Sequence, residues 1–290
     1  MKLLGSIEAG GTKFVCSVAN FDFEIIKSIQ LPTTSPEETL TAVIKFFEKY
    51  ELTALAVGSF GPIDIQEDSE RYGFITSTPK LGWKNTDIVG PLKSALKVPV
   101  VWTTDVNSSA YGEKMFGNGQ GTHSIVYFTI GTGIGGGSVQ GNQFIGGISH
   151  AEMGHAIVER HEKDRDFLGV CPFHGNRCLE GLASGPSIKA RTGRSGEDLP
   201  VDHEVFDLIA YYAGQIAYNT YVNLAPERII FGGSVLQSID MTKVRKYFNE
   251  FNNGYVQTSD LDDLIQISGV ADNGSATFGN FALALEALKK

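Results

Sequence analysis

Apolar and polar positions alternate along the start of the chain, in three short runs that glycine and asparagine residues separate. Alternation with a period of two is typical of strands that bury one face, so this pattern predicts an antiparallel meander. The runs lie at residues 3–7, 14–18 and 23–29. A helix is predicted next, because Ser35 can cap it, Pro36 suits its first position, and apolar residues then recur at helical spacing.

Strand and helix patterns alternate along the rest of the chain, which predicts α/β domains with mixed sheets. Strands are expected at 54–60, 98–103, 124–130, 138–144, 228–231 and 264–270, and helices at 88–96, 107–116, 205–224, 242–251 and 276–288. Residues 6–15 and 129–139 both read as strand, glycine turn, strand, so the same hairpin begins twice. We expect a smaller domain over 1–118, with a final helix at about 275–290 packing back on it, and a larger domain over 119–274.

The chain has 290 residues and a formal net charge of −9, from 33 acidic and 24 basic residues. A surface this acidic repels nucleic-acid phosphates, and no apolar run is long enough for a membrane-spanning helix. The first residues become glycine-rich before a signal-peptide core develops, and three cysteines are too few for a disulfide framework. We therefore expect a cytoplasmic protein without a nucleic-acid or membrane partner.

Three glycine clusters each follow a predicted strand, and they are the first candidates for a ligand site. Glycine lets backbone N–H groups approach an anion without a Cβ atom in the way, and threonine and lysine add hydrogen bonds and charge. The clusters are Gly10, Gly11, Thr12 and Lys13; Gly131, Thr132 and Gly133; and Gly232, Gly233 and Ser234. Any one of them could be an ordinary hairpin turn, whereas the three together favour a nucleoside triphosphate as ligand.

Two other nucleotide-binding motifs do not apply. The Walker A pattern is absent from the sequence. Gly131, Gly133 and Gly136 match the letters of the dinucleotide fingerprint, but that motif must open a helix, and strand-like residues follow here. Residues 131–137 are therefore expected to form a loop between two strands.

Four potential metal ligands gather in one short stretch: His155, Cys171, His174 and Cys178. Two thiolates and two imidazoles suit tetrahedral Zn²⁺. Four protein ligands leave no open position, so zinc is expected to stabilise a loop rather than to react. The alternative is that the cysteines are ordinary thiols. The remaining histidines, His123, His150, His161 and His203, are expected to be surface or hydrogen-bonded residues.

Three carboxylates are candidates for chemistry. Asp105 follows the strand predicted at 98–103, where it could cap the next helix or act as a general base at the carboxyl end of the strand. Glu152 and Glu180 flank the predicted zinc loop. Each alone is typical of a solvated surface charge, but together with Asp105 they could surround the hydroxyl groups of a polyol.

Several segments together carry a family pattern: IEAGGTKFVC (7–16), GSFGPID (58–64), TSTPKLGW (76–83), TDVNSSAYGE (104–113), TIGTGIGGG (129–137), SHAEMGH (149–155), CPFHGNRCLEGLASGP (171–186) and IIFGGS (229–234). In this order they resemble the ROK sugar kinases of the actin-like, ribonuclease-H-like ATPase superfamily, and among these the bacterial fructokinases. The resemblance extends over nearly the whole chain.

This resemblance implies two ribonuclease-H-like domains with mixed sheets around a central cleft, and ATP-dependent phosphorylation of D-fructose at its 6-hydroxyl. Asp105 would be the catalytic base, and Gly61, Pro62, Glu152, His155 and Glu180 would line the sugar site. ATP phosphates would lie over the turns at Gly10 and Thr132, with Pro186 and residues 232–234 near the adenosine. Mg²⁺ would accompany ATP, Zn²⁺ would be structural, and the protein would be a homodimer.

Three residues depart from the wider family pattern. Glu8 stands where actin-like ATPases usually have aspartate, a change that fructokinase-like members share. Thr104 stands where glucokinase-like members have asparagine, which favours fructose over glucose, and His174 replaces a cysteine while keeping four metal ligands. The alternatives are a kinase for mannose, glucose or N-acetylmannosamine and, more distantly, a non-catalytic sugar sensor of the ROK regulator type. Such regulators carry an N-terminal DNA-binding module, which we do not expect here because the first hairpin begins by residue 5.

Overall fold

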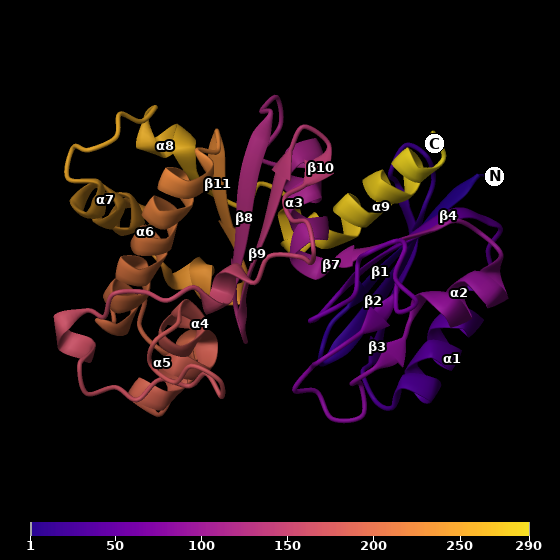
Figure 1. Cartoon of the computed structure of the whole chain (residues 1–290), viewed down its shortest axis with the longest axis horizontal. Helices are drawn as coiled ribbons and strands as arrows, with labels where there is room; N and C mark the ends of the chain where they lie inside the picture. Colours follow the sequence, from indigo (N-terminus) through magenta and orange to yellow (C-terminus); the bar gives the residue numbers. More distant parts are fainter. Residues whose placement is uncertain (1, 290) are drawn as a thin grey trace. The chain divides into compact units, whose positions relative to one another are not determined.

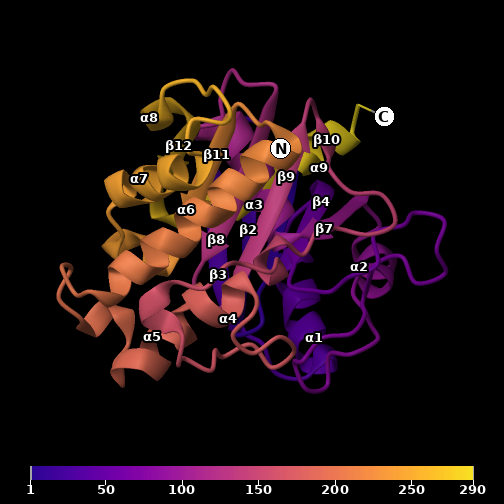
Figure 2. The same ribbon diagram turned by 60° about the vertical axis from the view of Figure 1, so that its left-hand side comes forward.

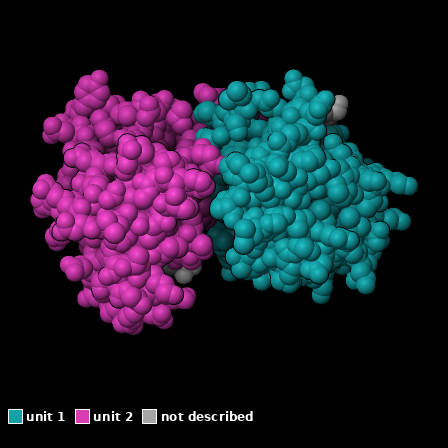
Figure 3. All heavy atoms as spheres, turned by 60° about the horizontal axis from the view of Figure 1, so that its bottom comes forward, with its two compact units in different colours: residues 1–117, 143–151, 270–290 teal, residues 118–142, 152–269 magenta. Residues whose placement is uncertain are grey.

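The computed structural model describes residues 2–289, apart from the side chain of residue 237. The chain divides into two compact units, which Figure 3 colours separately. Unit 1 comprises residues 1–117, 143–151 and 270–290, and unit 2 comprises 118–142 and 152–269. The segment 143–151 thus groups with unit 1, unlike the expected boundary, because Ile63 N–H and the Gln66 amide donate hydrogen bonds to it.

Unit 1 contains a mixed sheet in the strand order β3-β2-β1-β4-β7. Its strands are β1 (Leu3–Ala9), β2 (Lys13–Ala19), β3 (Ile25–Pro32), β4 (Leu52–Ser59) and β7 (Val100–Thr104). The first three pair antiparallel, and β4 and β7 run parallel to β1. The predicted meander is confirmed. A separate antiparallel pair joins β5 (Phe74–Ile75) to β6 (Thr86–Asp87).

Helices cover both faces of this sheet (Figure 1). The helices are α1 (Pro36–Phe47) and α2 (Val89–Leu96) on one face, and α3 (Asp105–Phe116) and α9 (Ser275–Ala287) on the other. Successive side chains of a strand point to opposite faces, so Leu3 of β1 is buried in the core that includes α1, and Leu4 in the core that includes α9. Ser35 caps α1 as predicted, because its side chain accepts a hydrogen bond from Glu38 N–H.

Unit 2 repeats the hairpin and parallel strands, in the order β9-β8-β11-β12. These strands are β8 (Ser124–Ile130), β9 (Ile134–Gln140), β11 (Arg228–Gly232) and β12 (Ile265–Ile267), and β10 (Gln143–Phe144) follows β9 along the chain. β8 and β9 are antiparallel, and β11 and β12 run parallel to β8. The expected loop over 131–137 is wrong at its second half: Gly135, Gly136 and Gly137 pair with β8, so the turn is limited to residues 131–133.

The helices of unit 2 are α4 (Leu179–Ala183), α5 (Gly185–Thr192), α6 (Val205–Leu224), α7 (Met241–Asn252) and α8 (Leu261–Leu264). The long helix α6 packs on the core that includes β8 and β11, and α7 lies beside it (Figures 1 and 2). Within that core, the rings of Phe128 and Phe231 stack with their centroids 5.6 Å apart. Over residues 2–289, none of the helices has the length and apolar character required to cross a bilayer.

Candidate functional site

Asp105 is the first residue of α3, directly after β7. The N-cap is its neighbour Thr104, whose Oγ1 accepts a hydrogen bond from Asn107 N–H at 3.1 Å. The capping role considered for Asp105 therefore belongs to Thr104. Asp105 Oδ1 accepts from Val106 N–H at 2.8 Å, and the side chain remains partly exposed. The carboxylate is thus held at the carboxyl end of a parallel strand, which is the usual location of active-site residues in α/β sheets.

The glycine turn of unit 1 is fixed by backbone hydrogen bonds. Gly10 N–H donates to the carbonyl of Lys13 at 3.0 Å, and a Cβ atom at Gly10 would lie 2.7 Å from that carbonyl oxygen. Only glycine fits there without a shift of the backbone. The side chains of Thr12 and Lys13 are exposed, and Lys13 Nζ donates to Gln30 at 3.1 Å. The turn therefore presents a hydroxyl and a cation on a rigid hairpin.

Glu8, at the end of β1, contacts the first turn of α9. Its Oε1 accepts a hydrogen bond from the hydroxyl of Thr277. Burial raises the pKa of the Glu8 carboxyl above its ordinary value, although the Thr277 hydrogen bonds and the Lys13 charge oppose that effect. The partner of Glu8 is distant in the sequence, and no local pattern indicated it.

Gly61 and Pro62, expected in the sugar site, lie against His150. The peptide bond between them is cis. Ile63 N–H donates to His150 Nε2 at 3.0 Å, and a Cβ atom at Gly61 would lie 3.5 Å from the imidazole ring. His150 is buried and hydrogen-bonded, which agrees with one of the two states expected for it. Its proximity to Gly61 was not predicted.

Glu180 of α4 lies against the glycine turn of unit 2. Its Oε2 accepts a hydrogen bond from Ile134 N–H at 3.0 Å. A Cβ atom at Gly133 would lie 2.8 Å from the same oxygen, so the close approach requires glycine. Glu152, by contrast, is an exposed residue that precedes the 3₁₀ turn Met153–His155.

A cavity of about 860 Å³ opens beside this turn, within unit 2. It has the size typical of a small-molecule site. Its lining includes four of the residues expected to bind the nucleotide, namely Gly131, Thr132, Pro186 and Ser234. Gly185 N–H donates to the carbonyl of Gly131 at 2.7 Å and so connects α5 to the turn.

The other glycines expected at this nucleotide site lie outside the lining. Gly133 contacts Glu180, and a Cβ atom at Gly232 would meet the Tyr127 hydroxyl. Gly233 has a positive φ of 98° and packs against the backbone of Ile130. These glycines allow close packing around the cavity. The sequence did not indicate that Lys189 and Glu197 would contribute to the lining.

The four predicted metal ligands come together. The donor atoms of His155, Cys171, His174 and Cys178 all lie within 4.8 Å of one another. His155 Nδ1 is 3.8 Å from each sulfur atom, and His174 Nδ1 is 3.6 Å from Cys171 Sγ. Both cysteines are buried, and His174 is exposed. Two sulfur and two nitrogen donors at this spacing fit a tetrahedral, four-coordinate metal ion of the zinc type.

Comparisons with known proteins identify the family of the chain. The sequence profile of the ROK family matches residues 4–287. A fructokinase of Lactococcus lactis subsp. cremoris is 49% identical, over 99% of this chain and 98% of that protein. A fructokinase of Streptococcus mutans serotype c is 50% identical, over 98% and 97%. A ROK family glucokinase from Streptomyces griseus, solved with glucose and AMPPNP, has the same fold with a TM-score of 0.75 and 23% identity, over 98% of this chain and 99% of that one. The chain therefore belongs to the ROK family.

Proposed function

We propose that this chain is a fructokinase, which transfers the γ-phosphoryl group of ATP to the 6-hydroxyl of D-fructose. The observation that carries the proposal is the identity of 49% and 50%, over nearly the full length, to two proteins named fructokinase. ATP is a fitting second substrate, because the cavity of unit 2 is large enough for a nucleotide and the related glucokinase was solved with AMPPNP.

We assign the role of general base to Asp105. The 6-hydroxyl oxygen of the sugar attacks the γ-phosphorus, the bond from that phosphorus to the bridging oxygen breaks, and ADP leaves. The hydroxyl proton passes to the Asp105 carboxylate. The Thr104 cap supports this role, since it holds the first turn of α3, and a base on a rigid element keeps its distance from the reacting oxygen.

The phosphate groups are assigned to the two glycine turns. Thr12, Lys13 and Thr132 are exposed and offer hydroxyl groups and a positive charge to the phosphoryl oxygens, which carry the negative charge of the transition state. Adenosine is assigned to the wall formed by Pro186 and Ser234. Mg²⁺, when bound with ATP, would neutralise charge on the β- and γ-phosphates.

The sugar is assigned to Gly61, Pro62, Glu152, His155 and Glu180, as the family resemblance implies. Glu180 is suited to this role, because Ile134 N–H uses Oε2 and leaves Oε1 for a sugar hydroxyl. Zn²⁺ at the four-ligand cluster would cross-link the loop from His155 to Cys178. A homodimer in the cytoplasm stays a prediction.

The direct test is to identify the product. The chain would be incubated with ATP, Mg²⁺ and fructose, and the sugar phosphate identified by ³¹P and ¹³C nuclear magnetic resonance. The proposal predicts fructose 6-phosphate and ADP in equal amounts. Phosphorylation at another hydroxyl group, or ATP hydrolysis without a sugar phosphate, would contradict it.

A further inference from the structure

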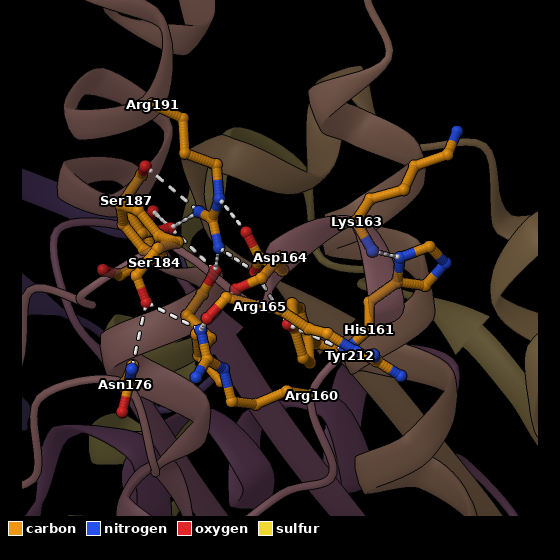
Figure 4. Close-up of polar contacts among 12 residues, drawn as sticks. Arg160, His161, Lys163, Asp164, Arg165, Asn176, Ser184, Ser187, Arg191 and Tyr212 are labelled. Atoms are coloured by element: carbon orange, nitrogen blue, oxygen red, sulfur yellow. Dashed lines mark hydrogen bonds and ion pairs between the residues drawn. The ribbon is translucent and has the colours of Figure 1, made fainter.

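Unit 2 contains a buried ion pair between Asp164 and Arg191 (Figure 4). Arg191 donates from Nε to Oδ1 at 2.9 Å and from Nη2 to Oδ2 at 2.5 Å, which is the paired geometry that guanidinium and carboxylate groups favour. The side chains are 10% and 3% exposed. Tyr212 of α6 donates its hydroxyl to Asp164 Oδ2 at 2.7 Å, so the carboxylate is fixed from two sides.

Arg191 belongs to α5, and its side chain also contacts α4, the other short helix beside the nucleotide cavity. Its Nη2 donates to the carbonyl of Leu182 in α4 at 2.8 Å, and its Nη1 donates to the carbonyl of Ser187 in α5 at 3.1 Å. The guanidinium group stacks on the ring of Phe167, 3.8 Å from the centroid. One side chain therefore fixes the end of α4 relative to α5.

These two helices carry residues with proposed roles. Glu180 lies on α4. Gly185, Pro186, Lys189 and Ala190 of α5 form one wall of the cavity, and Gly185 N–H bonds to the turn at Gly131. A shift of α5 would consequently change the shape of the nucleotide cavity.

Asp164 lies in the segment 160–168, between the metal ligands His155 and Cys171. Arg160 Nη2 donates to the carbonyls of Arg165 at 2.5 Å and Phe167 at 2.9 Å, which closes this segment on itself. Asn176 Nδ2 donates to the same Phe167 carbonyl at 3.0 Å, and Asn176 lies between His174 and Cys178 (Figure 4). The segment that holds Asp164 is thus tied to the metal-binding segment by sequence at both ends and by hydrogen bonds in the middle.

We propose that Asp164 and Arg191 are positioning residues through which the metal centre fixes α5, so that zinc occupancy sets the affinity of the cavity for a nucleotide. The proposal rests on the proposed nucleotide cavity and on zinc as the metal. The metal cluster and the nucleotide cavity would then be energetically coupled within unit 2, through the hydrogen bonds of Asp164 and Arg191. Couplings of this kind change binding constants by about 5- to 150-fold.

The test is a cycle of ADP dissociation constants, measured by calorimetry on the zinc-loaded and the zinc-stripped protein. In the wild type, zinc removal is expected to weaken ADP binding by at least about fivefold. Asp164→Asn and Arg191→Lys are each expected to weaken it by a similar factor with zinc bound, and zinc removal should then add less than about twofold. The proposal would be overturned if the substitution and zinc removal changed the ADP dissociation constant independently, so that their two factors multiplied.

The matched control is Asp207→Asn. Asp207 pairs with Lys243 at 3.1 Å and accepts the Tyr247 hydroxyl at 2.9 Å, so it reproduces the cation and tyrosine partners of Asp164. These partners lie on α7, which contributes no residue to the cavity lining or to the four-ligand cluster. Asp207→Asn should bind ADP as the wild type does, and zinc removal should weaken its ADP binding as much as in the wild type. If zinc removal no longer weakened ADP binding in this control, the role assigned to Asp164 and Arg191 would be contradicted.

A second measurement needs no variant. Zinc removal is expected to speed hydrogen exchange at the amides of Ser187 and Ile188, which donate to the carbonyl of the α5 N-cap Ser184, and at the amide of the α5 C-cap Gly193, which donates to the carbonyl of Lys189. The amides of β8 are expected to keep their protection. Unchanged exchange at α5 would overturn the proposal. If the wild-type protein bound no ADP, the assignment of the cavity to a nucleotide would be wrong, and the proposal would be wrong with it. If ADP bound with the same affinity with and without zinc, only the role proposed for Asp164 and Arg191 would be wrong.

Discussion

The Glu180 carboxylate accepts a hydrogen bond from Ile134 N–H at 3.0 Å, where the glycine turn of unit 2 enters β9. A residue from α4 is thereby fixed against the turn that borders the nucleotide cavity. Because this contact uses one carboxylate oxygen, the structural and the proposed sugar-binding roles of Glu180 fall on different atoms.

This separation gives a prediction for two variants. Glu180→Gln keeps a carbonyl oxygen for Ile134 but loses the charge offered to the sugar, and hydrogen bonds to charged groups contribute about 1.5–3 kcal/mol. We expect kcat/KM for fructose to fall by about 10- to 150-fold with an unchanged melting temperature. Glu180→Ala should show the same loss together with a lower melting temperature. A glutamine variant with wild-type kinetics would remove Glu180 from the sugar site.

Asp105→Asn preserves the shape of the side chain and removes the proposed base. Loss of a positioned acid–base group reduces kcat by about 10²- to 10⁴-fold, whereas ATP binding should change little. Asp240→Asn is a suitable control, because Asp240 also stands at a helix start, where it accepts from Thr242 N–H at 2.9 Å. Steady-state kinetics of both variants would decide the assignment, and a near-normal kcat for Asp105→Asn would refute it.

Zinc removal should release the loop from His155 to Cys178. The four donors come from both ends of this loop and lie within 4.8 Å of one another, so a bound metal ion would cross-link it, and structural zinc contributes directly to folding free energy. We expect a chelator to lower the melting temperature and to abolish fructose binding in calorimetry, with recovery when Zn²⁺ is added back. Full fructose binding by a preparation that elemental analysis shows to be free of zinc would contradict this prediction.

The ion pair of Asp164 predicts a pH dependence of stability. Burial opposes ionisation, but the hydrogen bonds from Arg191 and Tyr212 hold the pKa of Asp164 below its usual value. As the pH falls, Asp164 is therefore protonated in the unfolded chain before it is protonated in the folded protein. The ion pair contributes fully to the free energy of unfolding above about pH 5, and this contribution is lost as the pH falls below about 4. Breaking a buried pair costs about 3–5 kcal/mol, so Asp164→Asn should be less stable by that amount at pH 7. The difference from the wild type should shrink in acid, and a constant difference down to pH 3 would contradict the assignment.

Glu8 predicts the opposite trend. Its carboxyl has a raised pKa because of burial, so the folded state holds this proton to higher pH than the unfolded chain does. Ionisation of wild-type Glu8 therefore destabilises the fold as the pH rises above about 4. Glu8→Gln removes this effect and can still accept from Thr277. The melting temperature of Glu8→Gln minus that of the wild type should increase between pH 4 and pH 8. A difference that stays constant over this range would contradict the raised pKa.

The sequence predicted those elements whose structure is determined by residues close together in the chain. The ends of β8 and α6 agree with the prediction, because apolar periodicity and the turn residues beside them lie in the same short window. The clustering of the four predicted metal ligands was likewise identifiable from their spacing. For Gly135–137 the sequence predicts a loop instead of a strand, because glycine has no side chain that indicates strand pairing. The pairing of these residues with β8 determines their place in the sheet.

The remaining contacts depend on residues that the fold brings together. Glu8 meets Thr277, which lies 269 positions later in the sequence, and Gly61 meets His150, which lies 89 positions later. The pair of Asp164 and Arg191 joins a loop to a helix that no motif connects. A single sequence holds no signal for such pairs, since each partner alone resembles an ordinary surface charge or polar residue.

The proposed fructokinase activity is tested most sharply by the sugar specificity of phosphoryl transfer. ADP release would be measured with ATP and Mg²⁺ across fructose, mannose, glucose, N-acetylmannosamine and no sugar, on protein with verified zinc content. A fructokinase should show a kcat/KM for fructose that exceeds the values for the other sugars by at least about tenfold, the factor that one hydroxyl contact provides. A higher kcat/KM for another hexose, or turnover that does not depend on any sugar, would contradict it.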